Sequence, residues 1–440
     1  LSGLVGSEMC IRDSSKDLKR VVVDGGVKAG WVYDVTYRSK DPIVAGLGFA
    51  AVRDFVAAAR TRDVLGITAT RTVAFGESQS GRMLRDFLYE GFNASESGAR
   101  VFDGFLIYIA GGARGSFTYR FASSGSDTYY FPTRYPFTAD EQVDPVTGAR
   151  DGLLNRARKD GVEPKVLFAN SAVEYWGGRG AALTHTTVDG RADVEQPANV
   201  RIYFLAGQQH AQAAFPPARG NGERTQQLPN ALQAGPWVLR SLLVKMTAWL
   251  DTGAAPPVSR YPRIADGTLV TASALKFPAA IGQPAKAPVG NYRFDFGAAF
   301  ATKGVPTYPV KFLQPYTVLV PQIDADGNEM AGVRMPELAV PLATHTGWNF
   351  RDASIGSPQS FARLVGSYVP FALTRADREA AGDSRLSVAE RYATRDAYVD
   401  RIRAAARDLA AGGYLLSQDV EAIVRAAGEH WDWRHAATRP

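Results

Sequence analysis

The chain has 440 residues, of which 45% are hydrophobic and 21% are charged, and its formal net charge is +6. This length suits one large domain or two ordinary ones, and the composition is that of a folded protein. The arginines are scattered and form no basic stripe with interleaved aromatics, which argues against a nucleic-acid partner. No apolar run reaches the ~18–20 residues that cross a bilayer.

Residues 1–14 are expected to be non-native sequence. The segment 5–14 resembles the translated adapter of a sequencing library, so we exclude it from fold reasoning. It contains Cys10, the single cysteine, so no internal disulfide forms, and the sequence has no Cys/His cluster typical of zinc. Such an adapter also predicts that the native start is missing, together with any signal peptide, which leaves the compartment unknown.

The segments that follow alternate between β-prone runs and helix-like patterns. Runs at 20–23 and 31–37 precede a helix expected over 47–60, whose apolar positions recur at helical spacing. Further strands are expected at 73–77, 102–110, 165–170 and 200–206, and a long amphipathic helix at 236–250. This alternation predicts an α/β fold with a doubly wound, mainly parallel sheet, in a core over residues 15–254.

Two regions lie outside this alternation. Residues 111–160 are rich in glycine, serine and aromatics and predict a cap-like insert. Residues 255–440 form a C-terminal region with a β-hairpin at 317–341, turning at 324–328, and helices packed on the core. The turn superficially resembles a calcium loop, but its glycine and glutamate spacing favours an ordinary turn. Ser387 and Glu390 form a capping box at the start of a helix.

The segment 73–82 carries the most informative motif. A β-prone run ends in Gly-Glu-Ser-Gln-Ser-Gly and passes directly into a helical pattern, which is how a nucleophile elbow presents a serine. The turn is tight, so Gly76 and Ser80 must be small while Ser78 projects from the sheet edge. Ser78 is therefore the candidate nucleophile.

A serine nucleophile needs a histidine base and an acid, and in a parallel sheet both belong at the carboxyl ends of strands. His210 follows the strand ending at 206, and Glu174 follows the strand ending near 170. The chain order serine, acid, histidine is the one used by α/β-hydrolases. Each also has a plainer interpretation, His210 as a structural loop histidine and Glu174 as a buried carboxylate that fixes its loop.

The remaining candidates fit these roles less well. His185 could line a cleft, His345 lies in the C-terminal region, and His430 and His435 are expected at the surface. Asp103 precedes its strand and is rejected as the acid. Two further aspartates, Asp189 and Asp193, lie far along a loop.

An oxyanion hole needs two N–H donors. The backbone N–H of Gln79, directly after the nucleophile, is expected to be one of them. The glycine-bearing loop 39–48 is the candidate for the second, unless that donor is missing from this chain. Arg114, Arg120 and Trp176 are candidate substrate-binding residues for an acidic or aromatic acyl group, although surface positions for the arginines and packing roles for the aromatics of the insert are favoured.

These strings together resemble the large bacterial and fungal α/β-hydrolase-domain proteins. The matching residues include the elbow with Gly91-Phe92-Asn93, then Glu174-Tyr175-Trp176, Gly207-Gln208-Gln209-His210 and the run 320–328. The likeness covers nearly everything after residue 15 and implies serine ester hydrolysis by Ser78, Glu174 and His210. Members of the group look longer at the N-terminus.

We therefore expect a carboxylic-ester hydrolase that acts on a small-molecule ester without metal or other cofactor. Acyltransferase or amidase activity on the same triad remains an alternative, as does an inactive hydrolase fold that only binds ligands. The sequence does not determine the acyl specificity or the oligomeric state.

Overall fold

A computed structural model describes residues 46–436, except 62–65, 67, 116, 118–133, 212, 219–224, 233, 285–290, 304 and 308–309. It also describes residues 11–13, 21–23, 25–28 and 33. In this part of the chain the central sheet has four strands in the order β3-β4-β7-β8, all parallel. The strands are β3 (Val73–Glu77), β4 (Gly104–Tyr108), β7 (Lys165–Ser171) and β8 (Val200–Leu205).

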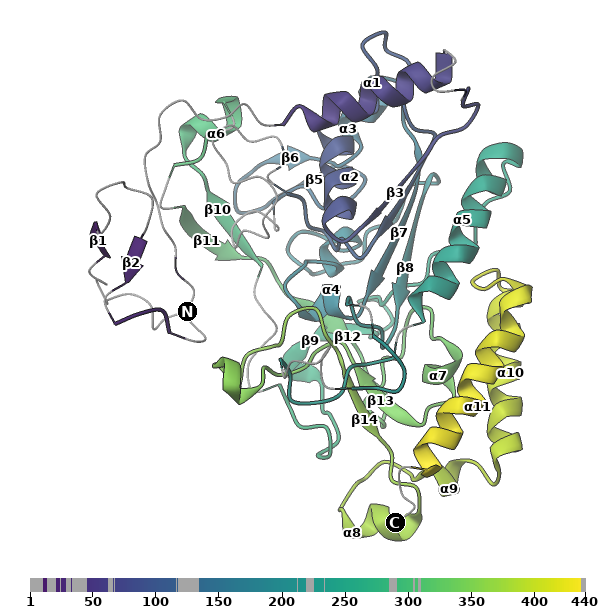
Figure 1. Cartoon of the computed structure of the whole chain (residues 1–440). Helices are drawn as coiled ribbons and strands as arrows, with labels where there is room; N and C mark the ends of the chain where they lie inside the picture. Colours follow the sequence, from purple (N-terminus) through teal and green to yellow (C-terminus); the bar gives the residue numbers. More distant parts are fainter. Residues whose placement is uncertain are drawn as a thin grey trace.

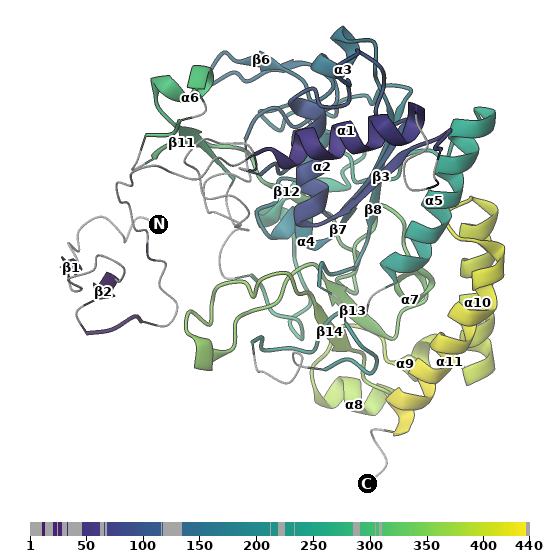
Figure 2. The same ribbon diagram turned by 45° about the horizontal axis from the view of Figure 1, so that its top comes forward.

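Different helices bury the two faces of this sheet (Figures 1 and 2). Phe105 and Ile107 of β4 pack with residues of α1 (Gly48–Thr61) and α2 (Gln79–Tyr89). Leu106 and Tyr108 pack on the other face with α5 (Gly235–Thr252) and with α10 (Arg395–Ala411) and α11 (Val420–Ala436). Because both faces are covered, β4 is apolar along its whole length. The predicted doubly wound, mainly parallel sheet is confirmed.

The strand that leads to Ser78 lies at one end of the described sheet. β3 pairs with β4 on one side, and the described residues provide no strand on its other side. Phe75, in the middle of β3, is 53% exposed, although it belongs to a strand of the central sheet. β1 (Ile11–Asp13) and β2 (Val21–Val23) form a separate antiparallel pair. The run predicted at 31–37 lies outside the described residues, apart from Tyr33.

The insert between β4 and β7 contains β5 (Gln142–Val143), β6 (Arg150–Asp151) and α3 (Asn155–Lys159), and α4 (Val173–Trp176) follows β7. Beyond α5 come three small antiparallel pairs. They are β9 (Leu269–Thr271) with β12 (Leu319–Pro321), β10 (Tyr292–Asp295) with β11 (Lys311–Pro315), and β13 (Ala343–Thr346) with β14 (Ser367–Pro370). The remaining helices are α6 (Ala298–Lys303), α7 (Pro336–Ala339), α8 (Arg375–Ala380) and α9 (Val388–Arg391). None of the helices described is long and apolar enough to cross a membrane.

The hairpin predicted over 317–341 is shorter than expected: its two arms pair only beside the turn, and β12 pairs with β9. The turn itself is present, since the Asp324 N–H donates to the carbonyl of Asn328 at 2.8 Å. Beside the turn, Ile323 and Glu329 form an antiparallel bridge, and the Met330 N–H donates to the Gln322 carbonyl at 3.0 Å. The pairing goes no further because the chain then moves to the edge of β8, where the Val333 N–H donates to the Phe204 carbonyl at 2.7 Å.

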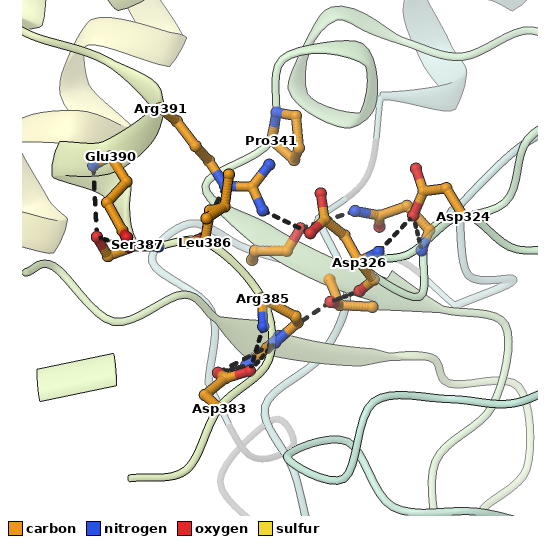
Figure 3. Close-up of polar contacts among 12 residues, drawn as sticks. Asp324, Asp326, Pro341, Asp383, Arg385, Leu386, Ser387, Glu390 and Arg391 are labelled. Atoms are coloured by element: carbon orange, nitrogen blue, oxygen red, sulfur yellow. Dashed lines mark hydrogen bonds and ion pairs between the residues drawn. The ribbon is translucent and has the colours of Figure 1, made fainter. Parts of the chain in front are cut away.

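The turn at 324–328 is held by its own aspartates (Figure 3). The Asp324 carboxylate accepts N–H bonds from Asp326 at 3.0 Å and from Asn328 at 2.9 Å. Asp326 pairs in turn with Arg391 of α9, which begins with the predicted Ser387–Glu390 capping box. Both carboxylates are thus engaged by protein donors, and no His/Cys/Asp/Glu group suited to a metal occurs among the described residues.

Candidate active site

Ser78 stands on the tight turn between β3 and α2. Its backbone angles, φ 57° and ψ −115°, are rare for any residue other than glycine. A Cβ added to Gly76 would lie 2.6 Å from the carbonyl oxygen of Ser80, and one added to Gly81 would lie 3.0 Å from the carbonyl of Tyr108. The small residues of the motif are therefore required by the close approach of the strand and the helix.

Glu174 is fully buried on α4, directly after β7. Its Oε2 atom accepts two hydrogen bonds from Ser171, one from the backbone N–H at 2.9 Å and one from the hydroxyl at 2.5 Å. These two donors fix the carboxylate and leave Oε1 directed at His210.

The histidine lies between the other two candidates. Nε2 of His210 is 2.8 Å from Oγ of Ser78, and Nδ1 is 2.5 Å from Oε1 of Glu174. Because the carboxylate can only accept, Nδ1 carries the proton and Nε2 is left to accept from the serine hydroxyl. This arrangement allows the imidazole to remove the proton of Ser78 while Glu174 stabilises the resulting cation.

The turn before the histidine is anchored on several sides. The side-chain oxygen of Gln208 accepts from the N–H of Ala234 at 2.5 Å, and the backbone carbonyl of Gln208 accepts from the N–H of Ala172 at 3.1 Å. The Gln209 side chain accepts the N–H of Gly366 at 3.1 Å. The loops of the acid and the histidine are thus joined to each other and to the C-terminal region.

The first proposed oxyanion donor, Gln79, is the first residue of α2 and directly follows Ser78. The helix dipole also favours negative charge at this end. Most of the loop suggested for the second donor, residues 39–45, lies outside the described residues.

The structure changes the interpretation of the substrate-binding candidates. Arg114 is 2% exposed; it donates to the Tyr135 carbonyl at 2.6 Å and lies 3.7 Å from Asp86. It is therefore not a surface residue, and its contacts hold the insert against α2. Trp176 is 1% exposed and belongs to the aromatic core beneath α4, so a substrate does not reach it. Arg120 lies outside the described residues.

The other histidines do not join the site. His185 and His345 are buried, and burial lowers their pKa values to about 3 and about 4, so both stay neutral. The predicted surface position of His430 is wrong: it is 4% exposed, with Nε2 2.7 Å from the hydroxyl of Tyr368. The correction follows from α11, which turns this residue inward. His435 is half-buried on the same helix.

The rejected carboxylates also lie elsewhere. Asp103 pairs with Arg60 at 2.6 Å, at the opposite end of β4 from the site. Asp189 bonds Thr187 within its own loop, and Asp193 accepts backbone N–H groups at 2.9 and 3.0 Å from the segment 264–265.

Sequence reasoning missed three arginines near the site. Arg82 is buried one turn after Ser78, and burial together with the charge of Arg363 lowers its pKa to about 10. Arg363 and Arg179 line a cavity of about 140 Å³ beside α4, with Trp348 and Phe361 among its apolar walls. Arg82 on the elbow helix and Arg179, five residues after Glu174, were signals in the sequence, whereas Arg363 comes from a distant loop of the C-terminal region.

Comparison of the chain with known protein families gives one match. A family model for the alpha/beta hydrolase domain matches residues 28–425. Neither the curated proteins nor the solved structures gave a match.

Proposed function

The chain belongs to the alpha/beta hydrolase domain family, and from this membership we propose that it is a serine hydrolase that cleaves carboxylic esters. The family supports hydrolase activity in general. The ester substrate and the serine mechanism rest on the continuous hydrogen-bonded chain from Ser78 through His210 to Glu174.

In the acylation step, Nε2 of His210 takes the hydroxyl proton as Oγ of Ser78 forms a bond to the acyl carbonyl carbon. The carbonyl π electrons move to oxygen, and the backbone N–H of Gln79 donates to that oxyanion. When the tetrahedral intermediate collapses, the alkoxy group leaves with the proton from His210 and an acyl-enzyme remains.

Water completes the cycle. His210 removes a proton from the attacking water, and a second tetrahedral intermediate forms on the acyl carbon. Its collapse releases the carboxylic acid and returns the proton to Oγ of Ser78. Glu174 keeps its charge throughout, because its role is to orient the imidazole and stabilise the imidazolium.

The test is hydrolysis of p-nitrophenyl acetate by the wild type, by Ser78→Ala and by the control Ser273→Ala, which changes an exposed serine far along the chain. Turnover is expected in the wild type and the control and not in Ser78→Ala. A fluorophosphonate probe should label Ser78. Equal turnover in Ser78→Ala would disprove the mechanism, and absence of labelling would indicate a protein that only binds ligands.

Product analysis distinguishes an esterase from an acyltransferase or an amidase. With an added alcohol or amine, an esterase releases mainly the free acid, whereas an acyltransferase yields the new ester or amide. An anilide substrate tests amidase activity on the same residues.

A further inference from the structure

A buried carboxyl that the mechanism does not use lies under the turn carrying the histidine. Glu329 is 2% exposed, and its Oε2 accepts the N–H of Gly207 at 2.7 Å. Its Oε1 has no hydrogen-bond partner. Gly207 is two positions after the end of β8 and three positions before His210, so this contact fixes the point from which the histidine turn begins.

The backbone at Gly207 has little room to adjust. Its φ is +67°, which favours glycine, and an added Cβ would lie 2.7 Å from Leu338 and 3.2 Å from His345. The N–H therefore points into the protein interior, where loss of its acceptor would leave a buried donor without a partner.

The same carboxyl also borders the loop of the acid. The indole of Trp176, on the helix that carries Glu174, lies beside it and favours its charged form. Tyr175 of this helix is close enough for the charge of Glu329 to help raise the pKa of its hydroxyl, after burial. One side chain thus contacts the loops that supply two members of the proposed triad.

We infer that Glu329 is a positioning residue: it holds the histidine turn at Gly207 and ties that turn to the helix of Glu174. The inference rests on the proposed function, since it concerns how the proposed base is held.

The charge of Glu329 gives this contact a pH dependence. Burial raises its pKa to about 8, against the opposing effects of the Gly207 N–H, Trp176 and Arg334. Arg334 is itself paired with Asp324, at 3.4 Å, so it does not neutralise the carboxyl alone. Glu329 is consequently protonated at neutral pH. In mild alkali it becomes a buried anion. The anion accepts more strongly from Gly207, but the cost of burying its charge is expected to draw water into the turn and to loosen it above about pH 8.

Two substitutions separate the contact from the charge. Glu329→Gln keeps an oxygen that accepts from Gly207 and a polar group that cannot ionise. Glu329→Leu removes the acceptor and keeps the site apolar. The control is Asp193→Asn, which alters another carboxylate that accepts backbone N–H groups, from residues 264 and 265, away from the histidine turn.

The readouts are kcat and KM from pH 6 to 10, and hydrogen-exchange protection of the peptide that contains Gly207. Glu329→Leu is expected to lower kcat on the order of 10²-fold with KM little changed, because the base is displaced. Glu329→Gln should keep neutral activity but lose the alkaline fall in kcat and in protection that the wild type shows near pH 8. Asp193→Asn should behave as the wild type.

Wild-type kcat in Glu329→Leu, or an unchanged alkaline fall in Glu329→Gln, would overturn the inference. Should Glu329→Leu not fold, the pH profile of Glu329→Gln decides alone. Failure of the proposed function is recognised separately, because Ser78→Ala would then retain turnover. In that case the positioning role falls with it, whereas an inactive Ser78→Ala beside a fully active Glu329→Leu removes the positioning role only.

Discussion

Replacing Glu174 by glutamine is expected to place the proton on the wrong nitrogen of His210. Oε2 of Glu174 receives two donors from Ser171, so the amide oxygen of the new side chain must occupy that position. The amide NH2 then faces Nδ1 of the histidine, which can only accept from it. The ring proton moves to Nε2, which becomes a donor toward the serine and can no longer act as its base.

The size of the effect follows from this loss of the base. A carboxylate-to-amide change with intact geometry lowers kcat about 10⁴-fold in serine proteases, which corresponds to about 5 kcal/mol. Glu174 is fully buried, so water cannot take over the accepting role, and the full effect is expected here. Residual activity would come from the oxyanion hole and from substrate binding.

The assay is kcat/KM for p-nitrophenyl acetate, with circular dichroism and thermal unfolding to verify that the variant folds. Asp193→Asn serves as the comparison, because Asp193 is one of the two other loop carboxylates considered from the sequence. A loss smaller than tenfold in Glu174→Gln would refute the reasoning about Ser171 and the tautomer. A large loss of kcat/KM in Asp193→Asn would show that Glu174 is not the acid.

Three further predictions concern stability. Gly76→Ala should destabilise the protein by about 2 kcal/mol or more in urea unfolding, because the new Cβ would lie 2.6 Å from the Ser80 carbonyl oxygen. The control Gly48→Ala should not destabilise it, because nothing lies within 4 Å of the new Cβ. Equal unfolding midpoints for the two variants would contradict the steric argument. Burial raises the folded-state pKa of Glu329 to about 8 from 4.5. As the pH rises from 4.5 to about 8, the wild type should therefore lose stability relative to Glu329→Gln, by about 1.4 kcal/mol per pH unit. Parallel curves of unfolding free energy against pH would show that the carboxyl is already ionised in the folded protein. Arg293→Met should cost about 3–5 kcal/mol by leaving the buried Asp144 charge unpaired, whereas Arg375→Ala, in an exposed pair, should leave the unfolding midpoint unchanged.

The sequence was sufficient for the sheet and for the three triad candidates, for a local reason. Each strand is a short apolar run whose end can be read from the chain, and neighbouring parallel strands end at the same edge. Ser78, Glu174 and His210 follow three such ends, and they lie within hydrogen-bonding distance of one another. The packing of Gly76 also followed from the spacing of small residues in the motif.

The rest depended on contacts between residues far apart in the sequence. Arg114 seemed suited to a surface or a substrate, but Asp86 and the insert bury it. The position of His430 beside two tryptophans near the C-terminus predicted exposure, but the side chain is buried and hydrogen-bonds to the Tyr368 hydroxyl. The predicted hairpin is shorter than expected for the same reason, since the edge of β8 competes for the returning strand. A pattern within one segment carries no information about such partners.

The turn that carries His210 shows why contacts between residues far apart in the sequence matter for the proposed function. Gly207, Gln208 and Gln209 are held by Glu329, Glu337 and Gly366, which follow them by 122, 129 and 157 positions. A motif at 207–210 can supply the base, but its position relative to Ser78 is set by residues of the C-terminal region. That region is therefore part of the assembly of the proposed site, and substitutions there should alter kcat without touching a substrate.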